Sequence, residues 1–169
     1  MFIRYRFSPN SSRTLLVVLE SREAFLVRFP SWEDVQSTTM STEPRRIALH
    51  GTPDTSAACF TPDGLWILTG SVKGVIRLVD GQDGRLVHDL PCQIGASMIR
   101  EIVLDEQSRH VAVNMNDRTV RTLRVTYNDG CEMPTGLTPT HKFQDLVSRT
   151  PWSGIGFSRG AESVSYTHL

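Results

Sequence analysis

Short apolar runs separated by turn-forming residues follow one another along the chain, and this pattern predicts strands rather than helices. The runs are rich in β-branched and aromatic residues, and turn clusters such as Ser71 to Gly74 bound them. No stretch keeps apolar residues at the i, i+3, i+4, i+7 spacing of an amphipathic helix. The strands that this pattern predicts cover residues 15–19, 24–29, 66–69, 75–79, 111–113 and 119–125.

The predicted strands fall into a repeating unit. In each unit an opening strand ends at an aromatic residue or a leucine, a turn follows, and the next two strands form a hairpin. The residues that end the opening strands are Phe7, Phe60, Leu104 and Phe157, at separations of 53, 44 and 53 residues. A period of about 40–45 residues with several strands per unit is typical of a WD-type β-propeller. We interpret residues 30–45 and 128–140, which are rich in Ser, Thr, Pro and Gly, as surface-loop insertions that lengthen two units.

The repeat predicts an all-β fold, namely an incomplete WD-repeat propeller with about three blades and the first strand of a fourth. A fourth, outermost strand of each blade is predicted at residues 46–49, 86–90 and 142–146. The predicted blades cover approximately residues 1–50, 51–92 and 93–147, and the next blade begins within 148–162. Because propellers need about four to eight blades to close a ring, we expect this chain to be part of a larger ring.

Composition and charge narrow the classes of function. Lys and Arg total 18 and Asp and Glu total 18, so the formal net charge is zero. This balance excludes a protein that coats nucleic acid through bulk charge, but it permits a local basic patch. The apolar runs are too short to span a bilayer, so we expect no membrane association. The three cysteines, Cys59, Cys92 and Cys131, are widely spaced and form no metal-binding pair, which favours a reducing compartment, the cytosol or the nucleus.

Two motifs for catalysis and cofactor binding occur without the context that they need. Residues 156–160 match G-x-S-x-G, but this nucleophile motif of hydrolases requires a following helix and then an acid and a histidine. We therefore interpret the motif as a blade turn, and we keep hydrolysis at Ser158 only as a distant alternative. The glycines from 154 to 160 are wrongly spaced for a dinucleotide loop, and the five histidines lack metal-ligand spacing. The sequence therefore predicts no catalytic residue, no cofactor and no metal site.

A few further residues receive only a structural interpretation. The adjacent carboxylates Asp105 and Glu106 are interpreted as a solvated turn, and Trp66 and Trp152 are interpreted as blade core. The basic pairs are interpreted as surface charge, and they are Arg4 with Arg6 and Arg45 with Arg46.

Three segments of the chain resemble one known family. Residues 142–152 read K-F-Q-D-L-V-S-R-T-P-W, which closely resembles a stretch in the retinoblastoma-binding protein five family of WD-repeat proteins. Residues 69–76 and 116–121 resemble two other segments of that family in the same order, so the resemblance covers roughly residues 3–162. Members of this family are propeller subunits, with about seven blades, of COMPASS/MLL-type complexes that methylate the fourth lysine of histone H3.

The resemblance implies a scaffold without catalytic activity, acting in the nucleus with the other subunits of a histone methyltransferase complex. It also implies that the propeller helps to seat the complex on nucleosomes, and it implies no cofactor and no small-molecule substrate. The family has an acidic C-terminal tail that binds the methyltransferase, and this chain lacks that tail, so we expect it not to activate a methyltransferase alone. The alternative is a WD-repeat interaction module of another assembly, because a fold does not determine a function.

Three arginines are the candidate site residues. Arg118, Arg121 and Arg149 fall in turn or strand-end positions of the segments that carry the resemblance. Arginine suits phosphate because its planar guanidinium forms paired hydrogen bonds and stays charged. The functional interpretation is contact with the backbone of nucleosomal DNA. The structural interpretation is a salt bridge or a tie to a carbonyl group within a blade, and the sequence leaves both open.

The last residues of the chain have a separate interpretation. Residues 164–169 read V-S-Y-T-H-L, which is what GTC-TCT-TAT-ACA-CAT-CTN would encode. That nucleotide sequence resembles the mosaic end of a transposon-based sequencing adapter. We therefore expect the native sequence to end near Glu162 and residues 163–169 to be non-native. The alternative is that these residues are a genuine, divergent terminus.

Overall fold

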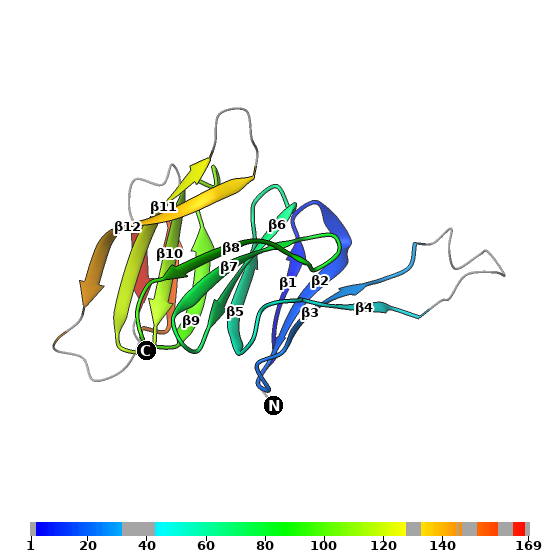
Figure 1. Cartoon of the computed structure of the whole chain (residues 1–169), viewed down its shortest axis with the longest axis horizontal. Coiled ribbons are helices and arrows are strands. Elements are labelled where there is room, and N and C mark those ends of the chain that lie inside the picture. The colour runs from blue at the N-terminus through cyan, green and yellow to red at the C-terminus, as the bar shows by residue number, and fades with distance from the viewer. Residues whose placement is uncertain are drawn as a thin grey trace.

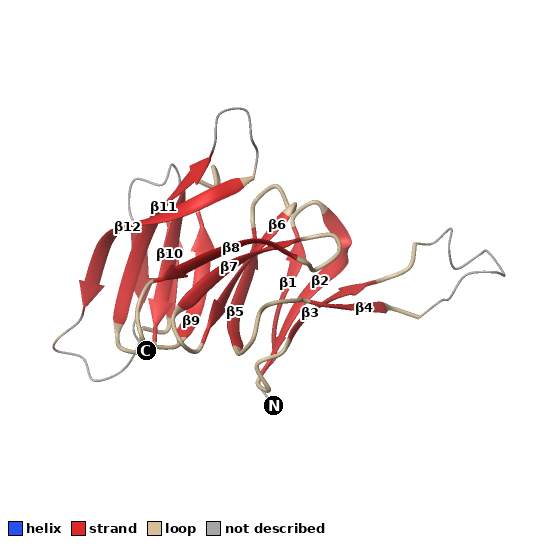
Figure 2. Cartoon of the chain, viewed as in Figure 1, coloured by secondary structure: helices blue, strands red, loops and turns tan. Residues whose placement is uncertain are grey.

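The computed structural model describes residues 3–31, 43–127, 133–144, 146, 152–158 and 164–167, and these form antiparallel sheets (Figures 1 and 2). The first sheet contains β1 (Ile3–Ser8), β2 (Ser11–Leu19), β3 (Ala24–Arg28) and β4 (Arg45–Ala48). The second contains β5 (Thr55–Phe60), β6 (Trp66–Ser71), β7 (Val75–Asp80) and β8 (Leu86–Gln93). The third contains β9 (Ile99–Leu104), β10 (His110–Met115), β11 (Thr119–Tyr127) and β12 (Pro134–Gln144). A final pair contains β13 (Gly154–Phe157) and β14 (Val164–Thr167).

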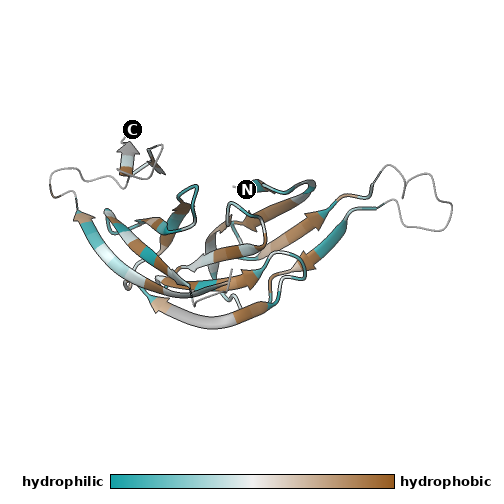
Figure 3. Cartoon of the chain, turned by 90° about the horizontal axis from the view of Figure 1, so that it is seen from above, coloured by the Kyte–Doolittle hydropathy of each residue, from teal (hydrophilic) through white to brown (hydrophobic). Residues whose placement is uncertain are grey.

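Each four-stranded sheet is a meander, because its strands neighbour one another in chain order. The sheets follow one another along a curve, with apolar residues concentrated on the strands (Figure 3). The strands that begin the sheets, β1, β5 and β9, contact one another in succession. The prediction of an all-β fold is confirmed, and the part of the chain that the structure describes contains no helix of the length and apolarity that crossing a membrane would require.

The second sheet is buried on both faces. Ile67 and Leu68 are consecutive residues of β6, so their side chains leave the sheet on opposite faces. Ile67 belongs to a core cluster shared with the first sheet, which supplies Leu26, whereas Leu68 belongs to a cluster shared with the third sheet, which supplies Ile102. Burial on two faces explains why this strand reads as a continuous apolar run rather than as an alternating one.

The outer strand of the third sheet is longer than the sequence pattern predicts. The sequence pattern indicates a loop over residues 128–140 and a strand over residues 142–146, but β12 pairs with β11 from Pro134 to Gln144. Pro139 lies opposite Leu123, beside one of two register shifts in this ladder. A proline is tolerated there because β12 is at the edge of its sheet, where a missing N–H removes no ladder bond from a further strand. The prediction of a loop over residues 134–140 is therefore wrong.

The interpretation of Asp105 as part of a solvated turn is also wrong. Asp105 is 2% exposed, and its Oδ1 atom accepts hydrogen bonds from the backbone N–H groups of Arg109 and His110 at 2.7 and 2.9 Å. The turn between β5 and β6 uses Thr61 in the same way, because its Oγ1 atom accepts from the backbone N–H of Trp66 at 3.1 Å. A buried acceptor at this position closes the turn between the first two strands of a sheet.

Trp152 is core, as the sequence analysis predicts. It is 6% exposed, and its indole N–H donates to the backbone carbonyl of Arg118 at 3.2 Å. Trp66 is partly buried against the cluster between the second and third sheets. Trp152 thus anchors the start of the last strand pair to the turn between β10 and β11.

Hairpin turns between the second and third strands share a left-handed residue. This residue is Arg22 in the first sheet, Gly74 in the second and Arg118 in the third, with φ angles of 67°, 75° and 65°. At Gly74 a side chain would meet a second obstacle, because a Cβ atom would overlap the carbonyl oxygen of Gly95 in the loop after β8. The backbone of the chain therefore passes close to itself at Gly74.

Replacement of Gly74 by alanine should lower the free energy of unfolding by at least about 2 kcal/mol. The cost has two sources. A side chain at residue 74 would be strained by the left-handed φ. Its Cβ atom would also overlap the backbone at Gly95, which cannot move away freely because the neighbouring Ile94 N–H donates to the Gly74 carbonyl. Urea unfolding followed by tryptophan fluorescence measures it. Gly156→Ala is the matched control, because a Cβ there meets nothing within 4 Å, and its change should stay within about 0.5 kcal/mol. Equal losses for the two variants would contradict this account.

Cys59 should be inert in the folded chain. Its side chain is 2% exposed, and burial raises the pKa of the thiol to about 12, an effect that the Arg6 guanidinium only partly opposes. The thiolate is the reactive form, so at about pH 8 iodoacetamide should label Cys59 only in urea. Peptide mass spectrometry measures the labelling, with the less buried Cys92 as the internal comparison. Equal labelling rates for Cys59 and Cys92 without urea would refute the prediction.

Candidate interaction site at the inner strands

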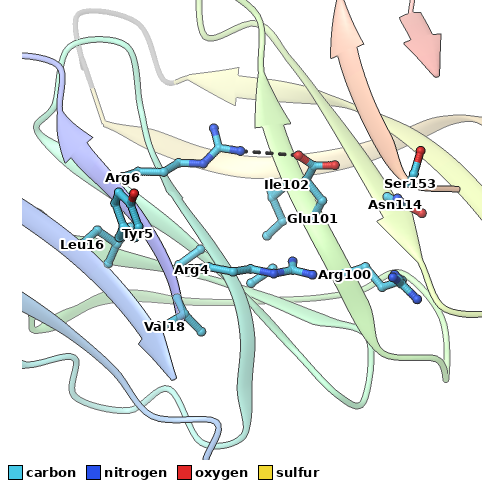
Figure 4. Close-up of a pocket in the computed structure, with 12 residues that line it drawn as sticks. Arg4, Tyr5, Arg6, Leu16, Val18, Arg100, Glu101, Ile102, Asn114 and Ser153 are labelled. Carbon is cyan, nitrogen blue, oxygen red and sulfur yellow. Dashed lines mark ion pairs between the residues drawn. The ribbon is translucent and has the colours of Figure 1, made fainter. Parts of the chain in front are cut away.

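A cavity of about 450 Å³ opens where the first strands of the sheets converge (Figure 4). β1 contributes Arg4 and Arg6, β9 contributes Arg100 and Glu101, and β10 contributes Asn114. Arg4 and Arg6 are on the same face of β1 because residues two apart on a strand point the same way. Both side chains extend from β1 toward β9 (Figure 4). The cavity is thus built by residues that are about a hundred positions apart in the sequence.

One ion pair crosses the cavity. The Nη2 atom of Arg6 lies 3.5 Å from Oε1 of Glu101, and the two side chains are 49% and 26% exposed. An ion pair with this exposure contributes little to stability, because water screens it. The other carboxylate oxygen of Glu101 accepts from the backbone N–H of Ile155 at 3.2 Å, which ties β9 to β13. Glu101 is therefore occupied on both oxygens.

Positive charge is in excess around this cavity. In the part of the chain that the structure describes, neither Arg4 nor Arg100 forms an ion pair, although Nη1 of Arg100 donates to Oδ1 of Asn116 at 3.3 Å. Three arginines and the one carboxylate of Glu101 line the cavity, and the Arg100 side chain runs from β9 away from Arg4 (Figure 4). The excess favours an anionic ligand at this place.

Asn114 borders the cavity, and its side-chain amide is buried. The residue is 1% exposed, and its Nδ2 atom donates to the backbone carbonyl of Trp152 at 3.0 Å. That bond fixes the orientation of the amide, and it leaves the Oδ1 atom buried with no hydrogen-bond partner. An unpaired buried acceptor costs free energy, and here it accompanies the bond by which Nδ2 holds the Trp152 carbonyl.

The predicted site residues lie elsewhere. Arg118 is half-buried in the turn between β10 and β11, and its backbone carbonyl accepts from Trp152. Arg121 is half-buried on β11, and its Nε atom is buried without a hydrogen-bond partner. Its guanidinium group lies beside Gly95, because a Cβ atom added at Gly95 would be 3.5 Å from Nη2 of Arg121. Arg149 is outside the described residues. Neither Arg118 nor Arg121 lines the cavity. Of the arginines that do line it, Arg4 and Arg6 are interpreted from the sequence only as surface charge, and no sequence pattern points to Arg100.

Chemistry at Ser158 lacks the required framework in the described residues. The nucleophile motif needs a strand, a sharp turn and a helix, whereas the next described element after Ser158 is the strand β14, which pairs with β13. No group of three or more His, Cys, Asp or Glu side chains is arranged to hold a metal ion within the described ranges.

Comparisons with known proteins give related sequences and a related fold. No known protein-family model matches the chain. The chain is 32% identical over 113 residues to the Set1 complex component swd1 of Schizosaccharomyces pombe, which covers 67% of this chain and 26% of that protein. It is 24% identical over 170 residues to the COMPASS component SWD1 of Saccharomyces cerevisiae, covering 94% of this chain and 38% of that protein. The chain therefore spans well under half the length of these curated relatives.

The fold is similar to a solved β-propeller. The crystal structure of the Cps50 (Swd1) β-propeller domain of Myceliophteria thermophila matches 96% of this chain and 51% of that chain, with a TM-score of 0.77 and 24% identity. This match confirms the predicted fold class, with the three meander sheets as blades. The chain is thus a homologue of the Swd1 components of the Set1 and COMPASS complexes, and its described sheets form part of a WD-repeat β-propeller.

Proposed function

We propose that this chain acts as a non-catalytic scaffold in a COMPASS-type complex that methylates the fourth lysine of histone H3 in the nucleus. The observation that carries the proposal is the 32% identity to the Set1 complex component of Schizosaccharomyces pombe over 113 residues. The partners on this proposal are the other protein subunits of the complex. Membrane, cofactor and small-molecule substrate have no part in it.

The architecture suits a scaffold. Four-stranded sheets with shared cores hold their connecting turns in fixed positions, and rigid elements that present loops are a common basis for recognition. The turn acceptors Thr61 and Asp105 fix the loops at one end of the sheets. Partner proteins would then meet a surface that needs no rearrangement on binding.

Affinity purification tests the scaffold proposal. A tagged form expressed from the native gene should co-purify with a SET-domain methyltransferase, and depletion of the protein should lower methylation of the fourth lysine of histone H3. Re-expression of the unmodified gene is the control and should restore the mark. Co-purification with an unrelated assembly, with methylation unchanged after depletion, would instead favour the alternative of a WD-repeat module in another complex.

We further propose that the propeller helps to seat the complex on nucleosomes through Arg118, Arg121 and Arg149, with DNA phosphates as their ligands. Of the two described arginines Arg118 supports the proposal better, because it lies in the turn between β10 and β11, next to the exposed residues Asn116 and Asp117, and is itself half-buried. Arg121 suits it less, because its Nε atom is buried within the sheet stack. Charge-assisted bonds to phosphate would give positioning rather than sequence recognition.

The salt dependence of nucleosome binding tests these arginines. For the assembled complex, Arg118→Gln and Arg149→Ala should each reduce the slope of log affinity against log salt concentration by about one, since each removes one phosphate contact. Arg124→Gln is the control, because Arg124 is an exposed arginine of the same strand as Arg121. An unchanged slope together with lower stability in urea would assign Arg118 and Arg149 a structural role.

A further inference from the structure

We propose that a second cavity, between the first two sheets, is a binding site for a phosphorylated serine or threonine side chain of a partner protein. The cavity measures about 1010 Å³, and it lies where the β1–β2 turn and the adjoining ends of β3 and β4 face the β5–β6 and β7–β8 turns. Its charged lining residues, which we call the arginine groove, are Arg13, Arg28, Glu43 and Arg45. The groove is distinct from the turn that holds Arg118 and does not depend on the proposed contact with DNA.

Two of the three arginines are brought together by the register of the first sheet. Arg28 ends β3 and Arg45 begins β4, and they lie directly opposite each other in the β3–β4 ladder. Leu26, two positions before Arg28, is buried in the core shared with the second sheet, so both arginines are on the face toward that sheet. Like charges directly opposite each other destabilise a sheet. An anion bound beside both arginines would offset this repulsion.

Hydrogen bonds between the two sheets hold the groove in place. The Nη2 atom of Arg28 donates to the backbone carbonyl of Gln82, in the turn between β7 and β8, at 2.5 Å. This bond uses one of the N–H donors of the guanidinium group and fixes the group at the seam between the sheets. On the other side of the groove, Nδ2 of Asn10 donates to the backbone carbonyl of Asp63 at 3.0 Å. The cations are therefore presented by a framework that is already tied together.

The charges in the groove match a dianion. Three arginines and one glutamate line it, so two positive charges are in excess. Within the described part of the chain none of the three arginines forms an ion pair. The nearby carboxylates of Asp63 and Asp80 accept hydrogen bonds from backbone N–H groups of their own turns. A phosphorylated side chain carries a charge of about −1.5 to −2 and three acceptor oxygens, whereas a carboxylate or a nucleic-acid phosphate carries one charge.

The apolar part of the lining favours a protein segment as the carrier of the phosphate. Phe29, Pro30, Pro44 and Leu65 line the same groove, and Phe29 is 40% exposed. Apolar residues that flank a phosphorylated side chain would cover this surface, in the way that arginine clusters and neighbouring pockets recognise phosphopeptides. A nucleic-acid backbone offers charge and sugar groups but no apolar side chain.

Fluorescence anisotropy on the purified chain tests the arginine groove. The probe is a fluorescein-labelled peptide in which one phosphoserine is followed by proline and leucine, and the matched probe is the same peptide without phosphate. The phosphorylated probe should bind at least about tenfold more tightly, because its oxygens accept charge-assisted hydrogen bonds. Arg13→Gln and Arg45→Gln should each weaken its binding about fivefold, and Glu43→Gln should strengthen it about twofold.

Arg46→Gln is the matched control. Arg46 follows Arg45 on β4 but faces the other side of the sheet, where its guanidinium carbon lies 3.8 Å from the centre of the Phe25 ring. This variant removes the same charge and should leave binding within about twofold. Arg28→Gln also loses the bond to Gln82, so circular dichroism and urea unfolding establish that each variant is folded before its binding is compared.

Four outcomes would overturn the proposal. Absence of binding, or equal effects of Arg45→Gln and Arg46→Gln, would show that the groove is not the site. Equal affinity for the phosphorylated probe and for one with glutamate in place of phosphoserine would show that any anion is accepted. Tighter binding of a short DNA duplex at the same phosphate concentration would assign the groove to nucleic acid.

Discussion

The constraint on which the structure depends is that the second sheet must be covered on both faces. Ile67 and Leu68 are adjacent on β6, yet they are 0% and 2% exposed, because the first sheet covers one and the third sheet covers the other. Each fully buried side chain of this kind contributes about 1.5–3 kcal/mol. A single twisted sheet could not bury them, so the cores between neighbouring sheets hold the described part of the chain together.

This stacking also creates the cavity. Sheets that stack through their faces along a curve bring their first strands together, and β5 therefore contacts both β1 and β9. Arg4 and Glu101 share a cavity only because the second sheet separates their strands by a fixed distance. The side chains buried between the sheets are apolar, whereas the lining of the cavity combines apolar residues with the charged Arg4, Arg6, Arg100 and Glu101. The hydrophobic cores therefore position the polar groups, and the single ion pair between Arg6 and Glu101 contributes little to that positioning.

The sequence predicts the strands well where local pattern and tertiary burial agree. The β-branched runs at residues 75–79 and 111–113 lie in sheets, and the repeat of Phe7 and Phe60 reflects the repeat of sheets. The pattern fails at residues 134–140, because proline and glycine there indicate a loop locally while an edge position tolerates them. It fails at Asp105, since adjacent carboxylates give no sign that one is buried as a turn acceptor. It misses the cavity because no local pattern reports a meeting of residues 4, 100 and 114.

The buried polar atoms without partners indicate where the structure is incomplete by itself. Among the described residues these atoms are Nε1 of Trp66, Oδ1 of Asn114 and Nε of Arg121. Of these three residues only Asn114 lines the inner-strand cavity, and its Oδ1 atom is itself closed to solvent. Asn114 serves the fold through its other amide atom, because Nδ2 donates to the backbone carbonyl of Trp152 and ties β10 to the start of the last strand pair. The unpaired Oδ1 atom is therefore the cost of that tie, since an apolar residue here would remove the donor to the Trp152 carbonyl.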